Sequence, residues 1–205
     1  MDKQEIKQHL IEKFNISDRN MVKIVNYVDL LLKFNKKYNL IGKSTENDIW
    51  CRHILDCAQV VKFLDFKSNS ILSDFGSGAG LPGVIIAIFK NNPRFHVKLY
   101  EKSPVKRSFL REIQSFVDFT VEENVYDFDI IKTDYIVCRA FKKLEEIFRI
   151  SREKVKNPHK IIILKGKKAS EELKKLPNNL NYRYRIENSL TDKDSKIIIA
   201  DKYEK

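Results

Sequence analysis

The sequence predicts an α/β protein built around a mostly parallel, doubly wound sheet. From residue 71 onward, short apolar segments typical of buried strands alternate with amphipathic segments of helical period. A glycine-rich segment, 76–83, follows the first apolar segment, as expected between a strand and a helix. The last two apolar segments, 182–186 and 197–199, have no helical pattern between them, which predicts a closing antiparallel pair.

The first 68 residues predict a helical extension in front of this sheet. Ser17 and Asp18 can cap a helix that ends near Asn39, and its apolar residues recur on one helix face: Met21, Ile24, Val25, Val28, Leu31 and Leu32. A second helix is expected to begin at Thr45–Asp48 and to continue to Leu64. The polar connector Lys67–Ser70 then divides the chain into residues 1–68 and a second domain of residues 69–205.

The elements of the second domain follow in order along the chain. Pro82 marks the start of the first helix, because proline is pre-set for the first helical turn and has no N–H to lose there. The predicted helices are Pro82–Lys90, Pro104–Phe116, Leu144–Val155 and Ala169–Leu176. The predicted strands are Ile71–Phe75, Phe95–Tyr100, Tyr135–Cys138, Lys160–Leu164, Tyr182–Ile186 and Ile197–Ile199, with a weaker strand near Phe119–Val125.

The segment Asp74–Gly83 is the most informative motif of the chain. Glycine permits positive φ and close approach of a ligand, so a strand, a glycine-rich turn and a helix start form a unit that seats a nucleotide-like ligand. Gly78–Gly83 matches G-x-G-x-x-G of NAD-binding proteins, whereas the segment from Asp74 reads D-x-G-x-G-x-G, like the loop of S-adenosylmethionine-dependent methyltransferases. Glu101 could bind ribose hydroxyls in either case. An ordinary glycine-rich turn is the simplest alternative.

Composition limits the classes of partner and compartment. The 205 residues contain 42% hydrophobic residues, enough for a core, and no apolar run approaches the roughly 18 residues of a membrane span. The charged N-terminus does not resemble a signal peptide, so we expect a cytoplasmic protein. The three cysteines and four histidines show no spacing typical of disulfide or metal sites. The net charge of +11 favours nucleic acid as partner, with a general bias toward lysine as the alternative.

Charged residues follow several predicted strands directly. In a parallel sheet the carboxyl ends of the strands meet at one edge, where ligands bind. That rule places the loop 76–80, Glu101, Arg139 and Lys165 together. Further basic residues follow the same strands and could form a rim for a phosphate backbone, or else be solvated helix faces: Lys102, Lys106, Arg107, Arg111, Lys142, Lys143, Lys167 and Lys168.

Six motifs in one order give the chain a specific resemblance. They are Asn39-Leu40, Arg52-His53-Ile54-Leu55-Asp56, Asp74–Gly83, Lys106-Arg107-x-Phe109-Leu110-Arg111, Asp134-x-x-x-x-Arg139-Ala140-Phe141 and Leu164-Lys165-Gly166. Together they resemble the bacterial small-subunit ribosomal RNA guanine-N7 methyltransferases, the RsmG or glucose-inhibited division protein B family. The resemblance implies a Rossmann-like class I methyltransferase fold with a seven-stranded sheet, and it favours S-adenosylmethionine over NAD.

The resemblance also implies a reaction and a set of site residues. The reaction is methyl transfer from S-adenosylmethionine to N7 of one guanine in the decoding-region loop of 16S rRNA. The residues expected at the cofactor are Gly76, Ser77, Gly78, Leu81, Glu101, Val125, Tyr126 and Arg139. The residues expected at the RNA are Arg139, Lys165, Lys106 and Arg107. We expect 16S rRNA or the 30S subunit as partner, a monomer, and neither a metal nor a membrane.

Two positions depart from the family pattern. Asn124-Val125-Tyr126-Asp127 stands where the family often has R-V-E-E, with Val121-Glu122-Glu123 as a rival placement, which leaves the adenine-side contacts open. Cys57 stands where serine is usual.

The target atom determines what catalysis requires. Guanine N7 carries a lone pair and no proton, so its attack on a sulfonium methyl group needs no general base, and we assign no proton-transfer residue. Alignment, proximity and electrostatics would supply the rate. The alternatives are an NAD-dependent oxidoreductase, a noncatalytic RNA-binding protein and a methyltransferase with another acceptor.

Overall fold

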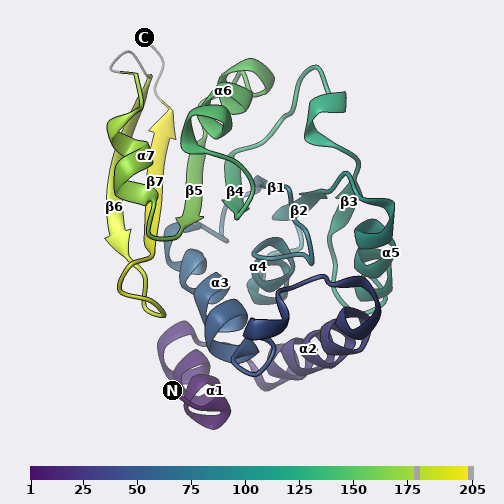
Figure 1. Ribbon diagram of the computed structural model, residues 1–205. Coiled ribbons are helices and arrows are strands. Elements are labelled where there is room, and N and C mark those ends of the chain that lie inside the picture. The colour runs from purple at the N-terminus through teal and green to yellow at the C-terminus, as the bar shows by residue number, and fades with distance from the viewer. Residues whose placement is uncertain (178–180, 203–205) are drawn as a thin grey trace.

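A computed structural model describes residues 1–177 and 181–202 of the chain. Its centre is a seven-stranded sheet in the order β3-β2-β1-β4-β5-β7-β6 (Figure 1). The strands are β1 (Ile71–Phe75), β2 (His96–Tyr100), β3 (Thr120–Glu122), β4 (Tyr135–Arg139), β5 (Lys160–Lys165), β6 (Tyr182–Asn188) and β7 (Lys196–Lys202). Strands β1 to β5 pair in parallel, while β7 pairs antiparallel with both β5 and β6. The predicted fold class, a mostly parallel α/β sheet with an antiparallel closing pair, is confirmed.

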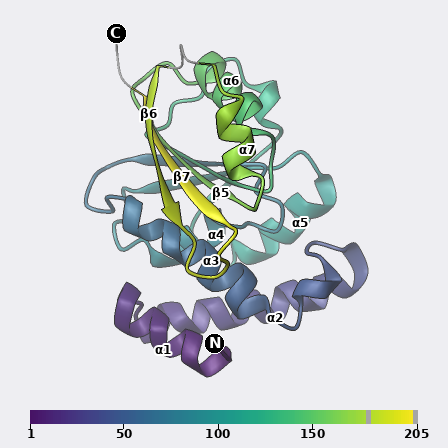
Figure 2. The same cartoon turned by 60° about the vertical axis from the view of Figure 1, so that its left-hand side comes forward.

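Helices cover both faces of the sheet (Figure 2). One face carries α1 (Lys3–Phe14), α2 (Asp18–Tyr38), α3 (Asp56–Ala58), α4 (Gly83–Phe89) and α5 (Pro104–Ile113). The other face carries α6 (Leu144–Lys154) and α7 (Ala169–Lys174). Each face has its own apolar core, as expected for strands that are buried on both sides.

The N-terminal helices pack into the same core as the sheet. Ile6 and Leu10 of α1 and Tyr27 of α2 are buried in one cluster with Leu72 of β1 and Leu99 of β2. The N-terminal helices therefore share a core with β1 and β2. The division of the chain near residue 68 stays a prediction. Among residues 1–177 and 181–202, no helix is long and apolar enough to cross a membrane.

Three local details differ from the sequence-based expectations. The apolar pattern did not predict where α1 begins and ends. The helix starts at a capping box formed by Asp2 and Glu5. The expected continuous helix from Thr45 to Leu64 is broken into a 3₁₀ turn (Lys43–Thr45), a π-helical segment (Trp50–Leu55), α3 and a second 3₁₀ segment (Gln59–Phe63). Pro82 follows a cis peptide bond and caps α4, which begins at Gly83. The π-helical segment carries Arg52 and His53, and π turns occur often at functional sites.

Candidate functional site

The glycine-rich loop begins where β1 ends. Its fold is set by backbone contacts to the next strand, because Gly76 N–H and Ser77 N–H both donate to the carbonyl of Tyr100, at 2.9 and 3.0 Å. Gly76 and Gly78 have φ of 73° and 60°, in the left-handed region that favours glycine. A Cβ atom at Gly76 would overlap the ring of Phe141, whereas at Gly78 the nearest atom would be 3.9 Å away. The backbone at Gly78 is thus open to a ligand.

Glu101 is held beneath this loop by two backbone donors. Its Oε2 accepts from Gly78 N–H and its Oε1 accepts from Ser103 N–H, each at 2.8 Å. The side chain is 6% exposed and lies directly after β2, as the sequence predicts. Each carboxylate oxygen has a second lone pair, so the group can still accept from ligand hydroxyls.

Asp74 is the buried acidic residue of the loop motif. Its Oδ2 accepts from Gly83 N–H at 2.9 Å, while its Oδ1 has no hydrogen-bond partner among the residues that the structure describes. Burial raises the pKa of Asp74 to about 7, against the opposing effect of the Gly83 and Ser77 hydrogen bonds. Through its hydrogen bond to Gly83, Asp74 ties the end of β1 to the start of α4.

A cavity of about 470 Å³ opens beside the loop, and we call it the glycine-loop cavity. Its walls come from the ends of β1, β2 and β4, from α5, and from the 3₁₀ turn η4 (Val125–Asp127) with the residue before it. They consist of Gly76, Tyr100, Glu101, Lys102, Lys106, Asn124, Tyr126, Ala140, Phe141 and Lys142. Phe141 and Tyr126 give it aromatic walls, and Glu101 gives it one buried carboxylate.

A second cavity, of about 500 Å³, lies on the other side of Ala140, and we call it the hairpin cavity. It is bounded by the π-helical segment, the ends of β4 and β5, and the turn between β6 and β7. Six basic residues and three acidic residues line it: Arg52, Arg139, Lys165, Lys167, Lys168 and Lys196, with Asp56, Glu172 and Asp192. This excess of positive charge suits an anionic ligand.

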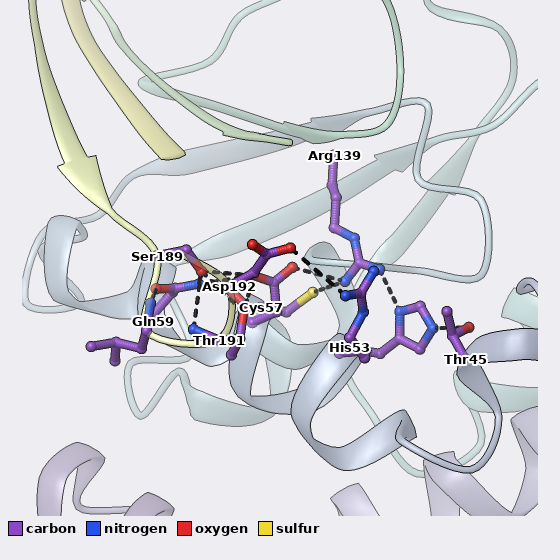
Figure 3. Close-up of polar contacts among 11 residues, drawn as sticks. Thr45, His53, Cys57, Gln59, Arg139, Ser189, Thr191 and Asp192 are labelled. Carbon is purple, nitrogen blue, oxygen red and sulfur yellow. Dashed lines mark hydrogen bonds and ion pairs between the residues drawn. The ribbon is translucent and has the colours of Figure 1, made fainter. Parts of the chain in front are cut away.

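Arg139 is the centre of the polar network in the hairpin cavity (Figure 3). It follows Cys138 at the end of β4, and its side chain is 17% exposed. Its Nη1 lies 3.3 Å from Asp56 Oδ2 and donates to Cys57 Sγ at 3.2 Å, while its Nη2 donates to His53 Nδ1. One carboxylate and two neutral acceptors therefore fix the guanidinium plane.

The contacts of His53 determine its tautomer. Arginine has no acceptor, so His53 Nδ1 must accept from Arg139. Burial and the charge of Arg139 lower the pKa of His53 to about 3, which keeps the ring neutral. The proton then lies on Nε2, which donates to Thr45 Oγ1 at 2.8 Å, and Thr45 Oγ1 in turn donates a hydrogen bond to the carbonyl of Gly42 at 2.7 Å.

Asp56 meets a different set of partners with each carboxylate oxygen. Its Oδ2 faces Arg139, and its Oδ1 accepts from Gln59 Nε2 at 2.9 Å, Thr191 Oγ1 at 3.0 Å and Ser189 Oγ at 3.4 Å. Burial raises the pKa of Asp56, and the charge of Arg139 and the two hydroxyl donors act in the opposite direction.

Lys165 lines the hairpin cavity but is already paired. Its Nζ lies 2.8 Å from Glu172 Oε2 and donates to the carbonyl of Lys142 at 2.8 Å. Glu172 also accepts from Leu144 N–H at 2.8 Å. Lys165 therefore joins β5, α6 and α7 behind the cavity.

The other predicted site residues are divided between the cavities and the core. Lys106 lines the glycine-loop cavity. Arg107 lies in neither cavity lining; its Nη1 donates to the carbonyls of Glu101 and Lys102 at 3.0 and 2.9 Å. Three further predicted positions are buried and line neither cavity: Ser77, Leu81 and Val125.

The comparisons with known proteins agree with this arrangement. Residues 20–198 match the family model "GidB: rRNA small subunit methyltransferase G". The chain is 32% identical over 203 residues to ribosomal RNA small subunit methyltransferase G of Pelagibacter ubique, covering 96% of this chain and 95% of that protein. The protein of the same name from Orientia tsutsugamushi is 32% identical over 201 residues, with coverage of 95% and 97%.

The chain belongs to the GidB family of rRNA small subunit methyltransferases. The resemblance predicted from six motifs is thereby confirmed, and with it the predicted reaction class, S-adenosylmethionine-dependent methyl transfer to small-subunit rRNA. The two non-methyltransferase alternatives, an NAD-dependent oxidoreductase and a noncatalytic RNA-binding protein, are set aside by the same membership.

Solved structures place the fold in the same class. A variant of MtNAS in complex with S-adenosylmethionine has a TM-score of 0.60 at 14% identity, covering 100% of this chain and 85% of that one. Fibrillarin of Aeropyrum pernix, with natively bound S-adenosylmethionine, has a TM-score of 0.53 at 13% identity, with coverage of 67% and 68%. At these identities the likeness concerns the fold alone, and it confirms the Rossmann-like methyltransferase fold.

The sequence motifs did not indicate that residues near the C-terminal end of the chain contribute to the candidate site. Thr191 and Ser189 lie more than 130 residues after Asp56, yet they donate to the same carboxylate oxygen. His53 and Asp56 carried a sequence signal, because both stand in one motif and one helical turn, but nothing in the sequence indicated that Arg139 would join them.

Proposed function

We propose that the glycine-loop cavity holds S-adenosylmethionine and that the hairpin cavity receives the target guanine. The two cavities meet at Ala140, next to Arg139, and this shared boundary carries the proposal. Methyl transfer then takes place across that boundary, with the cofactor and the base entering from opposite sides.

The residues of the glycine-loop cavity fit this cofactor. The buried carboxylate of Glu101 can accept two vicinal hydroxyl groups, and the open backbone at Gly78 permits close approach. Tyr126 and Phe141 offer aromatic surfaces for a flat base. We expect the buried residues Ser77, Leu81 and Val125 to support this site from the core, and Arg139 to meet the cofactor from the adjoining hairpin cavity. When bound, S-adenosylmethionine supplies an electrophilic methyl group on a sulfonium centre.

The protein's own residues then need to position the base rather than move a proton. Guanine N7 attacks with its lone pair, and the product base carries the positive charge. Arg139 is held rigidly by Asp56 and His53, so it can orient the guanine without a reorganisation cost at the reaction. Asp56 balances the charge of Arg139, which keeps the cavity from repelling a base that becomes cationic. Neutral His53 acts only as an acceptor for Arg139.

The basic lining of the hairpin cavity favours an extruded nucleotide of an RNA loop. A base in a stacked helix cannot reach a buried methyl donor, so the enzyme takes the nucleotide out of the stack. Lys167, Lys168 and Arg52 then meet the adjoining phosphates, chiefly as sequence-independent affinity. Lys106 and Arg107 stay predicted RNA contacts, with Lys106 nearest the cofactor.

The finer assignment of partner and compartment completes the proposal. We expect the substrate to be 16S rRNA in the decoding region, free or within the 30S subunit. We also expect a cytoplasmic monomer without a metal.

The experiment is methyl transfer from labelled S-adenosylmethionine to naked 16S rRNA and to 30S subunits, with the modified base mapped by N7-specific chain cleavage. A single methylated guanine in the decoding-region loop supports the proposal, and the better substrate identifies the partner. Methylation at another base or at no base would contradict it.

A further inference from the structure

The carboxylate of Asp56 contacts two separate parts of the hairpin cavity lining. Its Oδ2 pairs with Arg139 from the end of β4, and its Oδ1 accepts from Thr191 in the turn between β6 and β7. Thr191 lies 52 residues after Arg139 in the chain, and in the described part of the structure no hydrogen bond joins the two directly. Asp56 is the common partner.

The β6–β7 turn is a wall of the hairpin cavity, and it is fastened to α3 and the adjoining 3₁₀ segment by several contacts. Ser189, Thr191, Asp192 and Ser195 line the cavity. Gln59 Oε1 accepts from Leu190 N–H at 3.0 Å, while Gln59 Nε2 donates to both Ser189 and Asp56. Asp192 also lies 3.7 Å from Arg52 of the π-helical segment. The Asp56 side chain therefore contacts the turn directly, so a shift of the turn would change the contacts of Asp56.

We propose that Asp56 is a positioning residue that couples the β6–β7 turn to Arg139, so that a correctly seated turn is required for a correctly oriented guanidinium. This role of Asp56 rests on the proposed function in one respect, because it requires that the target nucleotide enters the hairpin cavity. A side chain with two oxygens that are each engaged on opposite sides cannot rotate about its last bond without breaking both sets of contacts. The wall that meets the RNA thereby sets the geometry of the residue that meets the base.

A double-mutant cycle between Asp56→Asn and Thr191→Val tests the coupling. Thr191→Val removes the hydroxyl that donates to Asp56 Oδ1 and that also lies 3.0 Å from Ser189 Oγ. We expect kcat at saturating RNA and cofactor to fall about fivefold, the effect of losing the hydrogen bond to Asp56. Asp56→Asn is expected to lower kcat by at least roughly tenfold, because a hydrogen bond to a charged group is lost. In the Asp56→Asn background, Thr191→Val should change kcat by less than about twofold.

The separate effects on KM and kcat distinguish a positioning role of Asp56 from a turn that serves only as a wall of the cavity. If Thr191→Val raises the KM for rRNA and leaves kcat unchanged, or if the two effects multiply in the double variant, the proposal is overturned. Thr191→Ser keeps the hydroxyl and is expected to restore kcat. Thr120→Val, on the exposed edge strand β3, and Asp118→Asn, in a surface ion pair with Lys90, are the matched controls.

A second cycle covers the case in which Asp56→Asn does not fold. Thr191→Val is then combined with Arg139→Lys, and the proposal predicts that Thr191→Val has no further effect on kcat once the arginine fork is gone. Multiplying effects would overturn it here as well. Wild-type enzyme that methylates no guanine in rRNA would refute the proposed function, whereas wild-type activity with independent effects would refute the coupling alone.

Discussion

The two cavities are built in different ways, although they share Ala140. The glycine-loop cavity takes its walls from residues 76–142, at the ends of adjacent parallel strands, and much of its polar contact is made by backbone N–H groups. The hairpin cavity takes its walls from four segments between residues 45 and 197, and side chains make its contacts. Local backbone geometry builds the first cavity, and long-range side-chain contacts build the second.

We expect the largest effects from one substitution near each cavity, the first on cofactor binding and the second on RNA binding. Gly78→Asp places a negative charge beside Glu101 and should weaken S-adenosylmethionine binding at least roughly a hundredfold, since like charges this close repel strongly. Gly166→Asp, in the open hairpin cavity, should weaken RNA binding and spare the cofactor. Calorimetry with the cofactor and gel-shift titration with rRNA measure the two effects. Undiminished cofactor affinity in Gly78→Asp would mean that the cofactor site is misplaced.

Arg139→Lys tests whether the hairpin cavity depends on side-chain geometry. Lysine keeps the charge but cannot reach Asp56, Cys57 and His53 with one planar fork. We expect kcat to fall roughly thirtyfold, as for loss of more than one charge-assisted hydrogen bond. Arg149→Lys, on the exposed side of α6, is the matched control in the same single-turnover assay. Equal rates for wild type and Arg139→Lys would show that charge alone suffices.

Two buried groups, Asp74 of the glycine-loop motif and His53 of the hairpin cavity, should contribute to the free energy of unfolding in opposite ranges of pH. Burial raises the pKa of Asp74 to about 7 from 3.8, so its contribution is full below about pH 4 and is lost as pH rises to 7. Burial and Arg139 lower the pKa of His53 to about 3 from 6.5, so its contribution is present above pH 6.5 and is lost as pH falls to 3. A pKa difference of one unit corresponds to about 1.4 kcal/mol.

Thermal unfolding of Asp74→Asn and His53→Gln across this pH range measures both contributions. The Tm of wild type relative to Asp74→Asn should fall as pH rises from 4 to 7, and relative to His53→Gln it should rise from pH 3 to 6.5. Tm differences that do not change with pH would contradict the assigned protonation states.

The smallest effect is expected where α2 supports the glycine loop. The buried Tyr27 hydroxyl donates to the carbonyl of Ala79 at 2.8 Å. Tyr27→Phe should lower the free energy of unfolding by about 1 kcal/mol, or Tm by roughly 2–4 °C, and weaken cofactor binding about threefold. Tyr184→Phe, on the exposed edge strand β6, serves as control. A loss of stability with unchanged cofactor affinity would limit Tyr27 to a structural role.

The same contrast explains how far the sequence could predict the structure. Strand and helix positions from residue 71 onward followed from apolar period and from punctuation by glycine and proline, and the glycine loop with Glu101 followed from the rule for strand ends. The Asp56–Thr191 contact could not be predicted, because it depends on how a hairpin turn folds back over α3. The π-helical segment was missed because its apolar pattern matches an ordinary helix.

Ala140, directly after β4, limits which side chains the protein can carry at this position of the site. Its φ is 49°, a left-handed conformation that costs a non-glycine residue roughly 1–2 kcal/mol. Ala140 is exposed and lines both cavities. In the proposed arrangement this one small side chain lies between methyl donor and acceptor, so the range of residues that survive at position 140 in a selection for activity would measure the clearance that the reaction requires.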